Sequence, residues 1–194
     1  MLQGLLTRKD VKIDDLYIGD KNALIVAARI TGYGNEYSAN VTCLSCAQGN
    51  SHQFDLEEIR KVKEVDEELF IESDGTFELT LPRSKAKVKL RLLNGKDEKM
   101  LSSISEKKKK LKLPDSAMTD QLKTVIVSVN GVSDSSTVSN FVDNLLAMDS
   151  KSIREHYAKM APNVDLKYDY ECPSCMSTTK INIPFTTDFF WPGG

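Results

Sequence analysis

Four cysteines are the residues of this sequence whose type and spacing point most directly to chemistry. They form two Cys-x-x-Cys motifs, Cys43 with Cys46 and Cys172 with Cys175. This spacing lets two neighbouring thiolates bind one metal ion, and two such pairs complete a tetrahedral zinc site. Four thiolate ligands leave no open coordination position, so the predicted zinc ion is structural and not catalytic.

Other states of the four thiols remain open from the sequence. The cysteines could be free and buried, or they could form disulfides. Zinc knuckles often place glycine directly after the second cysteine, because that position favours a positive φ. Ala47 and Met176 occupy these positions here. His52 could also replace one cysteine as a zinc ligand, although an alternating strand position explains this histidine as well.

Strands are predicted on both sides of each motif, so each motif lies at the tip of a hairpin. The strands cover residues 36–42 and 52–56 around the first motif, and 164–171 and 178–185 around the second. Two facing hairpin tips that give two thiolates each are the plan of a zinc ribbon. Joining Cys43 to Cys175 closes a loop of roughly 130 residues, and metal binding would offset the entropy that this closure costs.

Helices and one further hairpin are predicted outside these strands. Residues 76–81 and 87–92 alternate polar and apolar side chains around a turn at 82–85, which favours a β-hairpin. Apolar residues recur with the helical period further along the chain. The predicted helices cover residues 20–30, 95–112, 116–130, 136–148 and 149–160.

Together these elements predict an α+β fold, in which a zinc-ribbon-like pair of hairpins carries the two motifs. A β-hairpin and a group of helices form an insertion between the two halves of the ribbon. The chain is expected to make one compact domain. Its predicted parts are an N-terminal helical segment (1–36), the ribbon hairpins (37–56 and 164–185), a β-hairpin insertion (57–94), a helical insertion (95–163) and an aromatic tail (186–194).

The composition excludes several classes of protein. Hydrophobic residues make up 40% of the 194 residues and the net charge is −2, whereas a general nucleic-acid binder would be more basic. No apolar run is long enough for a membrane span, and the N-terminus lacks the features of a secretory signal, so a cytoplasmic location is expected. The two histidines lie outside any recognisable catalytic motif and no glycine-rich phosphate loop is present, so we expect no enzyme.

Several stretches resemble a known family. They are Ile18-Gly-Asp-Lys-Asn-Ala-Leu24, Ala28-Arg-Ile-Thr-Gly-Tyr-Gly34, Val41-Thr-Cys-Leu-Ser-Cys46, Asp120-Gln-Leu-Lys123, Val127-Ser-Val-Asn-Gly-Val132, Met148-Asp-Ser-Lys-Ser-Ile-Arg154, Cys172-Pro-Ser-Cys175 and Phe189-Phe-Trp-Pro192. In this order they are similar to the baseplate proteins of contractile-tailed bacteriophages, in particular the small baseplate hub or hub-assembly family. The resemblance covers the chain from about Asp14 onward.

The resemblance implies a non-enzymatic protein that helps to build the baseplate hub, the central plug beneath the tail tube. Its partners would be other baseplate and tail proteins. It would act in the host cytoplasm during assembly, and some members would remain in the virion tail baseplate.

Two features of the sequence could bind a partner. Phe189, Phe190 and Trp191 are consecutive aromatic residues near the C-terminus, and tryptophan is a favoured interface anchor. Alternatively, the three rings fold back onto the protein's own core. The lysine run at residues 107–110 could meet an acidic partner or nucleic acid, or it could be a solvated helix end.

Two other functions compete with the baseplate hypothesis. A zinc-ribbon nucleic-acid-binding factor would use the lysine run to contact phosphates, but the acidic pI near 5.8 argues against it. A thiol oxidoreductase would use a Cys-x-x-Cys motif that opens a helix beside a βαβ unit, whereas strands are predicted around both motifs here.

Overall fold

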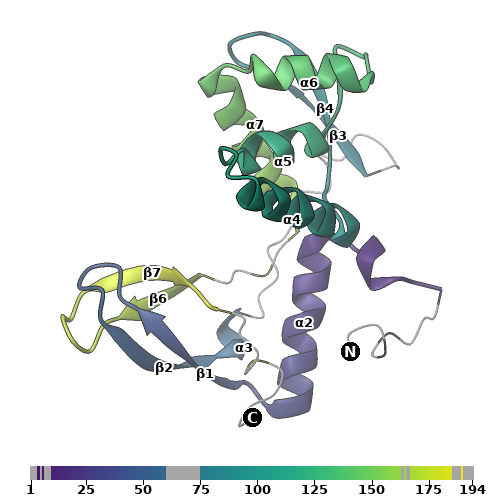
Figure 1. The fold of residues 1–194 in the computed structure, drawn as a ribbon. Helices are drawn as coiled ribbons and strands as arrows, with labels where there is room; N and C mark the ends of the chain where they lie inside the picture. The colour runs from purple at the N-terminus through teal and green to yellow at the C-terminus, as the bar shows by residue number, and fades with distance from the viewer. Residues whose placement is uncertain are drawn as a thin grey trace. The chain divides into compact units, whose positions relative to one another are not determined.

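The structure of the protein, a computed structural model, describes residues 4, 6, 10–59, 75–162, 164, 167–184 and 189 (Figure 1). It mixes helices with small antiparallel sheets, which confirms the predicted α+β class. In chain order the elements are η1 (Ile13–Asp15), α2 (Ile18–Tyr33), β1 (Glu36–Thr42), β2 (Gly49–Asp55), α3 (Leu56–Ile59), β3 (Thr76–Thr80), β4 (Lys87–Arg91), α4 (Gly95–Lys110), α5 (Ala117–Val125), β5 (Ile126–Val129), α6 (Ser135–Asp143), α7 (Ala147–Met160), β6 (Lys167–Glu171) and β7 (Thr178–Asn182). Within the described residues, no helix combines the length and the apolarity that crossing a membrane requires.

The chain divides into two compact units, in contrast to the single compact domain expected from the sequence. The cysteine unit consists of Met1–Thr7, Gly19–Lys63 and Asn163–Gly194, and the central unit of Arg8–Ile18 and Glu64–Pro162. The physical reason is that the buried apolar side chains form two clusters, one in each unit, which share no residue. Each unit therefore has its own hydrophobic core.

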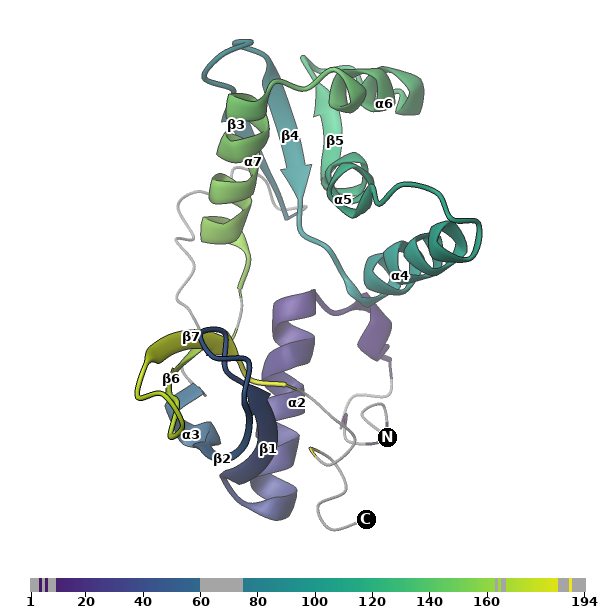
Figure 2. The ribbon, with the colours of Figure 1, turned by 60° about the vertical axis from the view of Figure 1, so that its left-hand side comes forward.

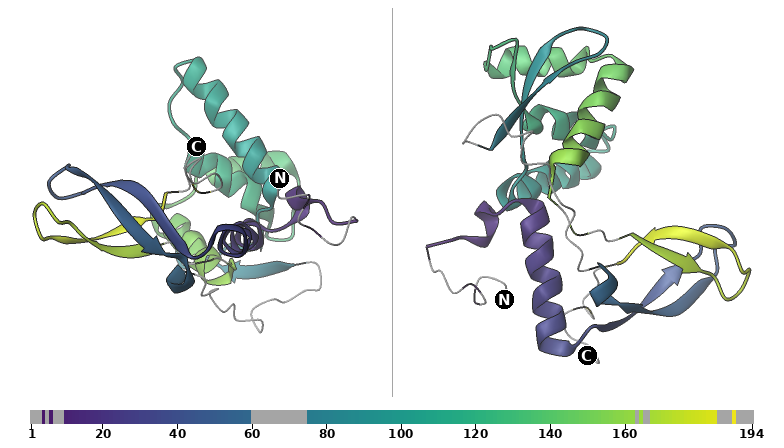
Figure 3. Two further views of the ribbon diagram at one scale, coloured as in Figure 1. Left: turned by 90° about the horizontal axis from the view of Figure 1, so that it is seen from below. Right: turned by 180° about the vertical axis from the view of Figure 1, so that it is seen from behind.

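The cysteine unit is built from two antiparallel hairpins, β1 with β2 and β6 with β7. The two hairpins lie side by side in all the ribbon views (Figures 1, 2 and 3). Inward side chains alternate along β1, and Tyr37 also donates a hydrogen bond of 2.7 Å from its hydroxyl to the carbonyl of Pro184. An isolated two-stranded hairpin is at best marginally stable, so the hairpins depend on packing against each other and on Val26 of α2.

The central unit contains a three-stranded antiparallel sheet in which β4 lies between β3 and β5 (Figure 2). The predicted hairpin of residues 76–81 and 87–92 is confirmed as β3 and β4. Phe77 of β3 is fully buried and its ring lies 6.4 Å from the ring of Tyr157 in α7. Helix α7 thus packs against the sheet, and the two together bury apolar side chains in the core of the central unit.

The third strand corrects one helix prediction. Residues 126–129 form β5, whereas the sequence analysis placed them in a helix over 116–130. Val88 and Leu90 of β4 pair with this segment, along the free edge of the β3–β4 hairpin. The β-branched residues of the segment favour a strand there. Asn130 and Gly131 both have positive φ, of 50° and 81°, which is the conformation of the Asn-Gly type I′ turn.

The boundary between the last two helices was also predicted wrongly. Helix α6 ends at Asp143 and α7 begins at Ala147, whereas the helical period suggested one helix over 136–148 and the next from 149. Asp134 caps the start of α6 by accepting a hydrogen bond from the backbone N–H of Thr137. The earlier start of α7 places Asp149 in its first turn, where the carboxylate accepts two backbone hydrogen bonds from the β3–β4 turn.

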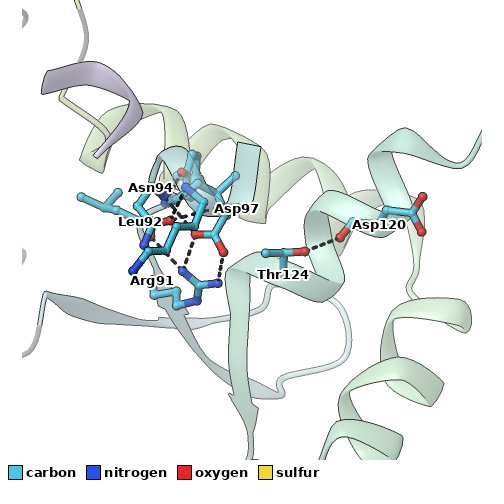
Figure 4. Close-up of polar contacts among 9 residues, drawn as sticks. Arg91, Leu92, Asn94, Asp97, Asp120 and Thr124 are labelled. Atoms are coloured by element: carbon cyan, nitrogen blue, oxygen red, sulfur yellow. Dashed lines mark hydrogen bonds and ion pairs between the residues drawn. The ribbon is translucent and has the colours of Figure 1, made fainter. Parts of the chain in front are cut away.

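An ion pair fixes the passage from β4 into α4 (Figure 4). Arg91 binds both carboxylate oxygens of Asp97, at 2.7 and 2.8 Å. Asp97 also accepts the backbone N–H of Asn94, whose own side chain accepts the N–H of Asp97, so the helix begins with a reciprocal capping box. Hydrogen bonding to Arg91 lowers the pKa of Asp97 below its usual value, which keeps the pair charged.

Helix α4 ends in a Schellman motif with a lysine at the position that glycine usually takes. The backbone N–H of Leu113 bonds the carbonyl of Lys108 at 2.9 Å, and that of Lys112 bonds the carbonyl of Lys109 at 3.1 Å. Lys112 consequently has a φ of +53°. A left-handed conformation is costly for a residue with a Cβ atom, so this turn carries strain.

Lys112→Gly is expected to raise the free energy of unfolding by about 0.5–1 kcal/mol, because glycine adopts the left-handed conformation without a Cβ clash. Thermal unfolding would measure the change. The matched control is Lys110→Gly, two residues earlier in the right-handed helix, which is expected to cost about 1 kcal/mol. Equal destabilisation by both substitutions would show that the φ of Lys112 carries no strain.

Candidate metal centre

The loops after β1 and β6 bring all four cysteines together. The four sulfur atoms lie within 4.8 Å of one another. The Sγ atoms of Cys43 and Cys175 are 3.8 Å apart, and those of Cys46 and Cys172 are also 3.8 Å apart. Each of these close pairs joins one hairpin to the other, so the cluster links chain segments that are far apart in the sequence.

The separations fit one tetrahedral ion. Zinc–sulfur bonds of about 2.3 Å place two thiolates of a tetrahedron about 3.8 Å apart, whereas a disulfide requires about 2.05 Å. All four cysteines are free thiols, with Cys43 and Cys172 buried and Cys46 and Cys175 exposed. The residues present therefore fit the predicted metal, and a disulfide is absent from the cluster.

Both loops have the same backbone conformation despite lacking the usual glycine. Ala47 and Met176 each have a φ of 58°. Their backbone N–H groups bond the carbonyls of Cys43 and Cys172, at 2.9 and 2.8 Å. Both loops therefore adopt the left-handed conformation without glycine, at a cost of about 1–2 kcal/mol for each of these two residues.

Backbone N–H groups and neighbouring thiols decide which sulfur is charged. The N–H groups of Cys46 and Ser45 lower the pKa of the Cys43 thiol to about 6. The N–H of Gln48 acts in the same direction on Cys46, but the thiol of Cys175, burial and the thiol of Cys43 together outweigh it and raise the pKa of Cys46 to about 12. Four thiolates this close repel one another, so a divalent cation is the species that would hold all of them deprotonated.

Asn50 supports the cluster from outside and was not identified in the sequence analysis. Its Nδ2 lies 3.6 Å from the sulfur of Cys172, and its Oδ1 accepts a hydrogen bond of 3.2 Å from the hydroxyl of Ser174. Asn50 lies on β2, so it reaches across to the loop of the other hairpin. No spacing rule marks this asparagine, since only the packing of the two hairpins brings it to the site.

Asn50→Ala is expected to weaken zinc binding by about 10–100-fold, which is the usual effect of removing a hydrogen-bond partner of a metal ligand. Competition with a zinc chelator of known affinity would measure it. Gln53→Ala is the matched control, because Gln53 is exposed on the same strand. Equal zinc affinity of the two variants would show that the Asn50 contact does not support the ligand.

His52 lies outside the group of ligand atoms that come within 4.8 Å of one another, so its possible role as a replacement ligand is wrong. Its ring lies 4.8 Å from that of Phe54, and 5.2 Å from those of Tyr168 and Tyr170. The register pairs it with Ala39 of β1, as the alternating strand position suggested. Burial among these rings lowers the pKa of His52, which keeps it neutral.

The aromatic tail is described only at Phe189. This ring is fully buried, and it meets the ring of Tyr37 edge to face with the centroids 4.9 Å apart. Phe189 therefore packs on the protein's own core, which was the second of the two alternatives. From this buried position its ring cannot bind a partner. Phe190 and Trp191 lie outside the described residues.

The geometry also bears on thiol redox chemistry. Strands flank both Cys-x-x-Cys motifs, so neither motif opens a helix. The two thiols whose pKa is lowered, Cys43 and Cys172, are both buried, and a disulfide substrate must reach the attacking sulfur. The low pKa thus suits a bound thiolate better than a redox nucleophile.

Comparison with known proteins places the chain in a family. A family model described as T4 bacteriophage base plate protein matches residues 2–191. No curated protein and no solved structure gives a significant match. The family match covers nearly the whole chain, including both cysteine motifs and the central unit between them. This protein therefore belongs to the T4 bacteriophage base plate protein family, which confirms the resemblance seen in its sequence.

Proposed function

We propose that the protein is a non-enzymatic structural or assembly component of the hub region of a contractile phage tail baseplate. The observation that carries this proposal is the family match along residues 2–191. The hub assignment also rests on the sequence motifs that resemble hub proteins. Its partners are other baseplate and tail proteins, which it meets in the host cytoplasm during assembly.

Within this function, Cys43, Cys46, Cys172 and Cys175 bind a structural zinc ion in a zinc-ribbon-like pair of hairpins. The sulfur separations of 3.8 Å support a tetrahedral ion. Such an ion would crosslink the two hairpins. Its four thiolate ligands would leave no open coordination position. The role of the metal is therefore to stabilise a surface for protein contacts.

Quantitative mass spectrometry of purified particles, and of tail assembly intermediates isolated from infected-cell lysate, tests the function. A fixed number of copies per particle would identify a structural subunit. Abundance in tail assembly intermediates with none in finished particles would identify an assembly factor that leaves. Absence of the chain from both particles and tail intermediates would contradict the proposal.

Phe190 and Trp191 are the proposed aromatic anchors for a partner, since the adjoining Phe189 is already used in the core. Trp191→Ala is expected to reduce incorporation into tail intermediates by tenfold or more, at about 2 kcal/mol for an interface hot spot, with an unchanged Tm. Phe189→Ala is the matched comparison, and it is expected to lower the Tm. Normal incorporation of a Trp191→Ala protein with a lowered Tm would assign this residue to the core.

A further inference from the structure

The end of α4 and the residues after it expose apolar and basic side chains together. Leu111 is 69% exposed and Leu113 is 53% exposed. Lys107, Lys109 and Lys110 are exposed beside them in the last helical turn, and Lys112 follows in the left-handed turn. We call residues 107 and 109–113 the basic–leucine surface.

The motif that ends α4 normally hides an apolar side chain. In a Schellman motif the residue at the position of Leu113 packs on the residue at the position of Lys108. Lys108 instead binds Asp120, with 2.6 Å between Nζ and the carboxylate, and it also contacts Ser116. Leu113 therefore lacks its usual apolar neighbour at this turn.

The surface is held in one conformation and not left as a loose helix end. The Lys108–Asp120 ion pair ties α4 to α5, and the hydroxyl of Ser116 donates to the same carboxylate at 3.0 Å. The left-handed Lys112 then sets the direction in which Leu113 follows. Backbone strain that still leaves Leu113 53% exposed is better explained by a use of this surface than by folding.

The charge of the surface is strongly positive. Within the part of the chain that the structure describes, Lys108 alone of the run at 107–110 makes an ion pair. The other three lysines crowd one helical turn, where a partner with carboxylates would reduce their mutual repulsion. Two exposed leucines among them would gain free energy from contact with the apolar side chains of such a partner.

We propose that the basic–leucine surface docks an acidic segment with apolar side chains from another baseplate protein. This inference rests on the proposed function. Carboxylates of the segment would face Lys107, Lys109 and Lys110, and its apolar side chains would cover Leu111 and Leu113. A nucleic acid would satisfy the lysines but would leave both leucines in water. A preorganised turn also suits a shaped protein surface better than a fluid lipid layer.

Site-specific photocrosslinking in infected cells tests the proposal, with p-benzoylphenylalanine in place of Leu113 and, separately, Leu111. Mass spectrometry of the crosslinked peptides should identify a net-acidic segment with apolar residues in a tail protein. The combined variant Lys107→Gln, Lys109→Gln and Lys110→Gln should lower the crosslink yield about tenfold. The control places the same crosslinker at Met148, an exposed apolar position on α7 of the same unit, where no such crosslink is expected.

Several outcomes would overturn the proposal. They are crosslinks from both leucine positions to nucleic acid, to lipid or to residues 60–74 of the chain itself, and the absence of any crosslink from either position in tail intermediates that contain the chain. Unchanged yield in the lysine variant would also overturn it. Absence of the chain from every tail intermediate is a different result, because it contradicts the proposed function and not this surface alone.

Discussion

Cys172→Ser is expected to abolish stoichiometric zinc binding and to unfold the cysteine unit while the central unit stays folded. Cys172 is fully buried and its sulfur lies 3.8 Å from that of Cys46 on the other hairpin. Structural zinc sites supply an apparent binding free energy of about 10–16 kcal/mol, which is comparable to the whole stability of a small domain. Each hairpin is only two strands wide, so the hairpins depend on this link in addition to the buried cluster that they share.

Metal analysis and hydrogen exchange would measure the two parts of this prediction. One zinc per chain is expected in the native protein and none in the variant, with protection lost in β1, β2, β6 and β7 but kept in β3, β4 and β5. Ser45→Ala is the control, because Ser45 lies in the first cysteine loop without supplying a sulfur ligand. A native protein that binds no metal, and whose unfolding a chelator does not change, would contradict a zinc site and favour free buried cysteines.

Asp149→Ala is expected to destabilise the central unit by about 3–5 kcal/mol. Asp149 is fully buried, and its two carboxylate oxygens accept the backbone N–H groups of Arg83 and Ser84 at 2.8 and 3.0 Å. Hydrogen bonds to a charged group contribute about 1.5–3 kcal/mol each, and their loss leaves two backbone donors of the β3–β4 turn without an acceptor. Urea unfolding of the central unit would measure the loss.

The control for Asp149 is Glu155→Gln on the same helix. Glu155 is exposed and its ion pair with Lys151 spans 3.7 Å, so its removal should change stability by less than about 0.5 kcal/mol. Hydrogen exchange should show that the amides of Arg83 and Ser84 lose protection only in the Asp149 variant. If both variants unfold at the same urea concentration, the carboxylate does not hold the turn.

Ionisation of the Asp149 carboxylate also makes the stability of the central unit depend on pH. Burial opposes ionisation of Asp149, but the N–H groups of Arg83 and Ser84 outweigh it and lower the pKa below 3.8. A lowered folded-state pKa stabilises the protein above the unfolded-state pKa, and this contribution disappears as the pH falls through the folded-state pKa. The stability difference between native protein and Asp149→Asn should therefore shrink below about pH 4.

Local patterns in the sequence predicted the elements whose side chains alternate or recur regularly. Glu36–Thr42 became β1 with the predicted bounds, and residues 76–81 and 87–92 became the β3–β4 hairpin. The helices around residues 20–30 and 95–112 were also correct, although α2 is longer at both ends and α4 ends at Lys110. These elements form from contacts between residues close in sequence, so their patterns are visible without a structure.

Strand β5 is an element whose secondary structure the local sequence pattern did not predict correctly. Residues 126–129 satisfy a helical period as well as a strand, and only the open edge of β4 decides between the two. The Asn130–Gly131 pair was an available signal for a tight turn that the helix prediction overlooked. Pairing between distant residues therefore overrode the local periodicity.

By itself, the sequence determined that four cysteines in two motifs would form the candidate metal site, and that the chain resembles phage baseplate proteins. Only the tertiary structure decided the details of that site. It brought Asn50 to Cys172, kept His52 among aromatic rings and buried Phe189. Ligand spacing is a local property of the chain, whereas these contacts arise from the packing of two hairpins that lie more than a hundred residues apart in sequence.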